Sequence, residues 1–98
     1  MVELEVDLSK LNGRTIARLS EIIDEISAEQ GLSIRMKTSL AKFPGSIHWH
    51  LKKGRERGTL EVTLLPAKQR LWFSMHENRS ADWVMSAAQE FKRRIEGE

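Results

Sequence analysis

Three closely spaced runs of alternating apolar and polar residues constrain the fold of this chain more than any other feature. In a β-strand successive side chains point to opposite faces, so each run predicts a strand with one buried and one polar face. The two connectors, residues 54–57 and 66–68, are short enough for antiparallel hairpins. The three predicted strands span Ser46–Lys53, Gly58–Leu65 and Gln69–His76.

Two further strands and two helices are predicted around this meander. Residues 2–6 alternate between apolar and acidic side chains and predict a first strand. Residues 32–37 predict a second strand, which a type II turn at Phe43-Pro44-Gly45 ends. Apolar residues at helical spacing, followed by Gly31, predict a helix over roughly residues 13–30. The last helix is predicted to be capped by Ser80 and to carry Val84, Ala87, Ala88, Phe91 and Ile95 on one face.

The predicted order β-α-β-β-β-β-α is that of an α+β fold: a two-layer sandwich with a mostly antiparallel sheet and both helices on one face. The first strand, first helix and second strand form a right-handed crossover, and the opposite face of the sheet stays open. A length of 98 residues predicts a single domain over residues 1–98. The acidic start and the lack of a long apolar run predict a soluble, cytoplasmic protein with no membrane partner.

The alternation also predicts the hairpin register, and the register decides which side chains share the open face. If the hairpins pair Lys53 with Gly58 and Leu65 with Arg70, the apolar rows of the three strands align. An antiparallel second strand then adds Lys37 beside His48 and Arg35 beside His50. The open face carries three polar rows, which are His48, Thr63 and Trp72; His50, Glu61 and Ser74; and Lys52, Thr59 and His76.

His48-Trp49-His50 is the sharpest chemical motif in the chain. Its two imidazoles share one face of a strand, about 7 Å apart at Cα, and Glu61 of the next strand lies beside His50. Zinc accepts two histidines and a carboxylate, and a histidine beside a glutamate can also act as a general base. His76 is expected on the order of 12 Å from His50 at Cα, too far for a compact three-histidine site. The alternative is that these are ordinary, partly exposed histidines of a sheet.

Charge is segregated along the chain. Residues 1–34 hold seven acidic and three basic side chains, a net charge of −4. The remaining residues hold thirteen basic and seven acidic side chains, a net charge of +6. Four of these cations cluster at residues 52–57, where they can attract phosphates or simply keep a hairpin tip soluble. Parallel pairing of the first two strands would set acidic residues beside Arg35 and Lys37 and neutralise part of this basic surface.

Trp72 is the large aromatic ring predicted on the polar face of the sheet. Such a ring either stacks on a partner, such as a nucleic-acid base, or is covered by Arg70 or Lys37 through a cation–π contact. Trp49 and Trp83 are predicted to belong to the core. The chain has no cysteine, which excludes disulfides, thiol nucleophiles and cysteine-ligated zinc.

These observations favour a non-enzymatic module that binds a macromolecule through the open face and the basic hairpin. The expected partner is a protein, a second copy of the chain, or RNA. The sequence assigns no catalytic residue, metal ligand or cofactor, and the alternative is a metal- or histidine-dependent hydrolase or ribonuclease that uses His48, His50 and Glu61. The candidate binding residues are Arg35, Lys37, His48, His50, Lys52, Lys53, Arg55, Arg57, Arg70, Trp72 and His76.

Overall fold

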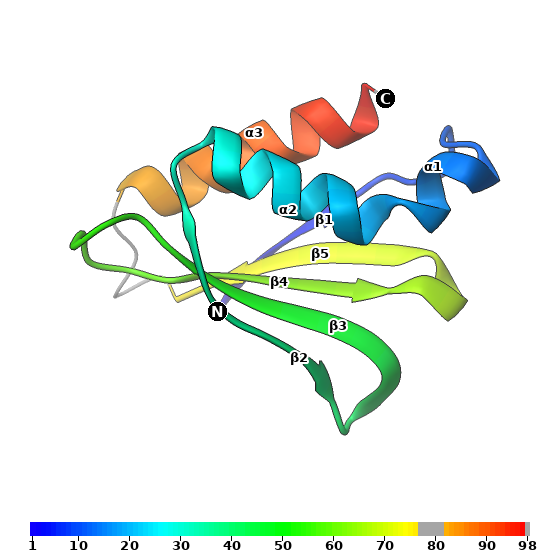
Figure 1. The fold of residues 1–98 in the computed structure, drawn as a ribbon, viewed down its shortest axis with the longest axis horizontal. Coiled ribbons are helices and arrows are strands. Elements are labelled where there is room, and N and C mark those ends of the chain that lie inside the picture. Colours follow the sequence, from blue (N-terminus) through cyan, green and yellow to red (C-terminus); the bar gives the residue numbers. More distant parts are fainter. Residues whose placement is uncertain (77–81, 98) are drawn as a thin grey trace.

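In the part of the chain that the structure describes, three α-helices lie on one face of a five-stranded sheet (Figure 1). The structure is a computed structural model that describes residues 1–76 and 82–97. The strands are β1 (Val2–Val6), β2 (Ser33–Leu40), β3 (Phe43–Lys52), β4 (Leu60–Leu65) and β5 (Arg70–Met75). The helices are α1 (Gly13–Ala17), α2 (Leu19–Glu29) and α3 (Asp82–Glu96), and a short 3₁₀ turn, Pro66–Lys68, joins β4 to β5.

The predicted α+β class and element order are confirmed, and of the placements open to the first strand, parallel pairing with the second does not occur. The spatial order is β1-β5-β4-β3-β2, and every neighbouring pair is antiparallel. β1 therefore pairs with β5 and lies at the opposite edge of the sheet from β2. This pairing sets the apolar residues of β1 beside Met75, Phe73 and Leu71 and so extends the apolar face by one strand. Its acidic residues do not neutralise Arg35.

The core lies between the helices and the apolar rows of the sheet. Trp49 pairs with Val62, and Val62 pairs with Phe73, as the hairpin register predicts. Phe91 of α3 packs on Phe73, with ring centroids 5.2 Å apart. Trp49 and Trp83 are both buried, which confirms the prediction that they are core residues.

The helix predicted over residues 13–30 is divided at Arg18 into α1 and α2. The Asn12 side chain caps α1 by accepting a hydrogen bond from the Thr15 N–H. α1 has no fully buried residue and only packs Ile16 against the core, whereas α2 buries its apolar stripe against the sheet. Ser80, the predicted cap of the last helix, lies outside the described residues. None of the helices within residues 1–76 and 82–97 is long and apolar enough to cross a membrane.

The turn between β2 and β3 lies earlier than the sequence predicts. Leu40 pairs with Phe43, so residues 41–42 form the turn, and Pro44 and Gly45 belong to β3. The register shifts at this point, and Gly45 has a φ of 82°, which an L side chain rarely adopts. Pro44 has no N–H to offer a ladder, so an irregular stretch near the strand end suits it. The Pro-Gly pair therefore forms a bulge instead of a turn.

A second irregularity, in β2, changes which residues reach the open face. The register shifts between Ile34, which lies opposite Leu51, and Met36, which lies opposite His50. Lys37 consequently falls opposite Trp49 on the helix-covered face, and its ammonium lies 2.8 Å from the Asp24 carboxylate of α2. The predicted positions of Lys37 beside His48 and of Arg35 beside His50 are therefore wrong: Thr38 lies opposite His48, and Met36 lies opposite His50.

Candidate metal centre on the open sheet face

Two of the three predicted polar rows are present on the face that the helices leave open. In the first row Thr63 lies between His48 and Trp72, as predicted. In the second row Glu61 lies between His50 and Ser74. The third predicted row is not part of the ladder, because β4 begins at Leu60 and Thr59 precedes it.

Three side chains of these rows bring one ligand atom each to a common point. His48 Nε2 lies 3.1 Å from His50 Nε2 and 3.3 Å from Glu61 Oε1, and His50 Nε2 lies 3.6 Å from the same oxygen. The register produces this geometry, because both histidines project from one face of β3 and Glu61 pairs with His50 from β4. Within the described parts of the chain, no other group of three histidine, aspartate or glutamate side chains converges closely enough to hold a metal ion.

His48 is the buried member of this triangle, with 6% of its surface exposed. Its Nδ1 lies 2.9 Å from the Thr63 hydroxyl oxygen. Burial and the neighbouring His50 lower the pKa of His48 from its usual 6.5, against Glu61, which raises it. The imidazole is therefore neutral at neutral pH. When its Nδ1–H donates to Thr63, its Nε2 presents a lone pair to the common point.

His76 is a further neighbour of Glu61. Its Nε2 lies 3.8 Å from Glu61 Oε2, while the other carboxylate oxygen faces His48 and His50. The sequence places His76 outside a compact three-histidine site, and the triangle of ligand atoms indeed excludes it. The sequence does not reveal that one glutamate is long enough to contact all three histidines.

Trp72 is covered by side chains of this chain. The Phe43 ring meets it edge to face, with centroids 5.7 Å apart, and the Arg70 guanidinium lies 4.6 Å from the centroid of the indole ring. Only 8% of Trp72 is exposed. Arg70 in turn donates two hydrogen bonds of 2.8 Å to the Glu5 carboxylate. Of the two roles left open for Trp72, cover by Arg70 is therefore the one in this structure.

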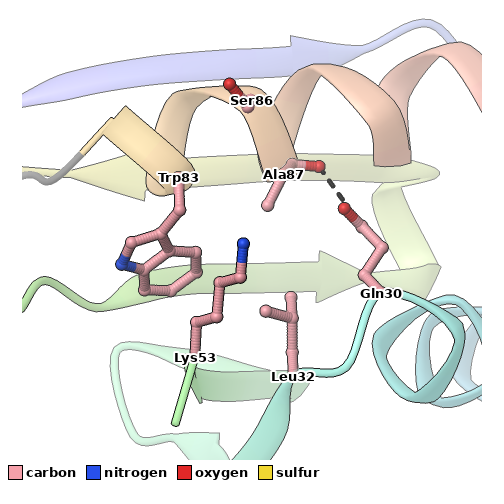
Figure 2. A pocket seen from close by; sticks show the side chains of 6 residues that line it. All are labelled: Gln30, Leu32, Lys53, Trp83, Ser86 and Ala87. Atoms are coloured by element: carbon pink, nitrogen blue, oxygen red, sulfur yellow. Dashed lines mark hydrogen bonds between the residues drawn. The ribbon is translucent and has the colours of Figure 1, made fainter. Parts of the chain in front are cut away.

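The hairpin cations lie on different sides of the sheet. Figure 2 shows Lys53 pointing toward α3, beside Trp83 and Leu32, in a pocket of about 110 Å³. Arg55 and Arg57 are exposed at the hairpin tip, which the Trp83 indole anchors by donating a 2.6 Å hydrogen bond to the Arg57 carbonyl. Lys53 is therefore separated from the basic residues of the open face.

A hollow of about 580 Å³ adjoins the ligand triangle. Its lining consists of Arg35, His50, Lys52 and Thr59. The Lys52 ammonium donates a 2.6 Å hydrogen bond to the Gly58 carbonyl, which fixes its position at the rim. The sequence predicts that these residues share one face, but it does not predict the shallow, solvent-open hollow that they line.

Two residues of the site, Thr63 and Phe43, were not among the candidate binding residues. The predicted register places Thr63 directly opposite His48, so cross-strand pairing could have identified Thr63 as the partner of His48 Nδ1. The sequence predicts Phe43 in a turn, and its role as a cover of Trp72 depends on the register shift between β2 and β3.

Comparison with protein-family models, curated proteins and solved structures gives no match to this chain.

Proposed function

We propose that this protein binds a divalent transition-metal ion of the zinc type through His48, His50 and Glu61. Nitrogen and oxygen ligands lie about 2.0–2.2 Å from zinc, and in a tetrahedral site two such ligands are about 3.3 Å apart. The three ligand atoms here are 3.1, 3.3 and 3.6 Å apart. This match between the triangle and the edges of a zinc tetrahedron is the observation that carries the proposal.

The charge balance of the triangle supports a cation at its centre. The Nε2 atoms of both histidines and a carboxylate oxygen lie within 3.6 Å of one another. The lowered pKa of His48 disfavours its cationic, doubly protonated form at neutral pH. A metal ion satisfies all three lone pairs at once, whereas one shared proton satisfies two. Thr63, as acceptor for His48 Nδ1–H, would fix the tautomer that presents Nε2, which is the usual arrangement around a metal-bound histidine.

Three protein ligands leave one position of a tetrahedral ion for water or another ligand. His50 and Glu61 are partly exposed, with 35% and 21% of their side chains accessible, so this position is reached from solvent. Sites of this kind lower the pKa of bound water and polarise ligand oxygens. The hydrolase or ribonuclease alternative rests on this open position.

The proposal is tested by titrating the metal-free protein with Zn²⁺ in a calorimeter. We expect one ion per chain with a Kd of about 1 μM or tighter. Glu61→Gln and His48→Asn should each weaken binding by more than about 100-fold, because each removes a direct ligand. Glu21→Gln, which removes an exposed carboxylate on α2, is the matched control. Equal affinity in wild type and Glu61→Gln would refute the site.

A second candidate function, a macromolecule-binding module, is supported by exposed arginines of β2 and of the hairpin between β3 and β4. Arg35, Arg55 and Arg57 have no carboxylate within 4 Å in the part of the chain that the structure describes. Unpaired arginines of this kind are available to phosphates of RNA or to acidic groups of a protein partner. The exposed apolar side chains Ile34 and Met36 on the edge strand β2 would suit a protein partner or a second copy.

This candidate is tested with single-stranded decauridylate at two salt concentrations. Binding should weaken with added salt, and the double substitution Arg55→Gln with Arg57→Gln should weaken it further. Lys10→Gln with Arg14→Gln removes two exposed cations far along the chain and is the control. Salt-independent binding would rule out a phosphate contact, and a dimeric mass in the absence of RNA would favour self-association.

A further inference from the structure

The hollow beside the ligand triangle is lined entirely by polar side chains, none of them acidic. Arg35 supplies a guanidinium, Lys52 an ammonium and Thr59 a hydroxyl. One N–H of the Lys52 ammonium donates to the Gly58 carbonyl, which leaves two N–H donors for a ligand. A space with two cations and a hydroxyl at its walls favours an anion over a neutral or cationic ligand.

The hollow and the proposed metal site share a wall. His50 lines the hollow, and its Nε2 is one corner of the ligand triangle. An ion bound at His50 Nε2 would therefore add its own charge to the edge of the hollow. The open coordination position of the ion and the donors of Arg35 and Lys52 would then be offered to one ligand.

We infer that this hollow binds a phosphate group, one oxygen of which occupies the open coordination position of the metal ion. The inference rests on the proposed metal site. A phosphate has enough oxygens for the metal, the Arg35 guanidinium, the Lys52 ammonium and the Thr59 hydroxyl, whereas a carboxylate has only two. The natural ligand is therefore a phosphate ester, either a small molecule or one phosphate of an RNA backbone.

The test uses the 98-residue chain loaded with Co²⁺, an ion that reports on its coordination through visible absorption bands. Phenyl phosphate, as a small monoester, should bind and change the Co²⁺ spectrum. Arg35→Gln and Lys52→Gln should each weaken phenyl phosphate about tenfold, because each removes a charge-assisted hydrogen bond, while Co²⁺ affinity stays unchanged. Arg14→Gln, which removes an exposed arginine of α1, should leave phenyl phosphate binding unaltered.

The outcomes separate this inference from the metal proposal. Failure of wild type to retain Co²⁺ or Zn²⁺ refutes the metal site. Two outcomes overturn the phosphate site alone. One is that the protein retains Co²⁺ but its spectrum does not respond to phenyl phosphate, and the other is that Arg35→Gln and Arg14→Gln lose the same amount of phenyl phosphate affinity. Decauridylate in place of phenyl phosphate identifies the source of the phosphate: a response that Arg35→Gln weakens assigns an RNA backbone, and its absence beside a phenyl phosphate response assigns a small ester.

Discussion

On the face of the sheet that α2 and α3 cover, Trp49, Val62 and Phe73 are fully buried. His48, Thr63 and Trp72 form a row on the other face, which no helix of the described residues covers. These three nevertheless expose no more than 8% of their surfaces. On the covered face a second layer excludes water. On the open face the side chains cover one another.

This difference separates stability from binding. The covered face gains stability from apolar burial, at about 25 cal/mol for each Å² removed from water. The open face buries polar groups, which are tolerated only when they are paired. In the described residues no buried side-chain nitrogen or oxygen lacks a hydrogen-bond partner. The largest losses of stability should therefore come from substitutions on the covered face, and substitutions in the ligand triangle should cost ligand affinity.

Phe73→Ala should give the largest effect. The ring packs on Phe91 and lies in the centre of the apolar rows, so its removal leaves a cavity in the core. Truncation of a buried phenylalanine costs about 3–5 kcal/mol of unfolding free energy. Urea unfolding measures this cost. A loss below about 1 kcal/mol would show that the helix-covered face is not the source of stability.

Zinc should produce the next largest effect, through the open face. An ion that binds only the folded chain, at a free concentration 100 times its Kd, adds about 2.7 kcal/mol to the unfolding free energy. Urea unfolding with and without Zn²⁺ measures the gain in wild type. Glu61→Gln should lose the gain, because a ligand is missing, and Glu21→Gln should keep it. A gain of equal size in Glu61→Gln would place the ion elsewhere.

Thr63→Val tests the contact behind His48. Valine has nearly the shape of threonine but cannot accept the Nδ1–H of His48, so the imidazole loses the partner that orients it. Loss of such an outer contact lowers metal affinity by about 10- to 100-fold. Zn²⁺ titration measures the change, and Thr63→Ser, which keeps the hydroxyl, should restore most of the affinity. Wild-type affinity in Thr63→Val would remove Thr63 from the site.

Alternation alone predicted the arrangement of β3, β4 and β5, and with it the meeting of His48, His50 and Glu61. The register of a two-sided sheet is strongly determined, because a slip by one residue would expose Trp49 and bury Glu61. The irregular stretches were not predictable in the same way. The register shift in β2 places Lys37 beside Asp24 of α2, and alternation within one strand carries no information about such a contact.

The alternation of apolar and polar residues also does not predict how far a side chain extends. The spacing of the rows correctly keeps His76 out of a compact three-histidine site. It does not reveal that the Glu61 carboxylate extends far enough to come within 3.8 Å of His76 Nε2. The position of β1 was likewise ambiguous from its own residues, since its apolar side chains suit either edge of an apolar sheet face. Its pairing with β5 also brings Glu5 to Arg70, which lies over Trp72.

The pair of Glu5 and Arg70 gives the smallest predicted effect, because both side chains are about half exposed and solvent screens their attraction. Hydrogen bonds from Arg70 lower the pKa of Glu5 from its usual 4.5. The folded chain thus binds a proton at Glu5 less readily than the unfolded chain. This carboxylate therefore stabilises the fold above pH 4.5, and its contribution is lost as the pH falls through the lowered pKa.

Glu5→Gln should flatten that part of the pH dependence of stability, since glutamine does not titrate. The measurement is urea unfolding of both proteins between about pH 3 and pH 6. Glu3→Gln is the matched control, because it removes a carboxylate from the same strand and face but leaves the Arg70 hydrogen bonds intact. An equal flattening in Glu3→Gln would mean that general charge, and not the cover over Trp72, sets this dependence.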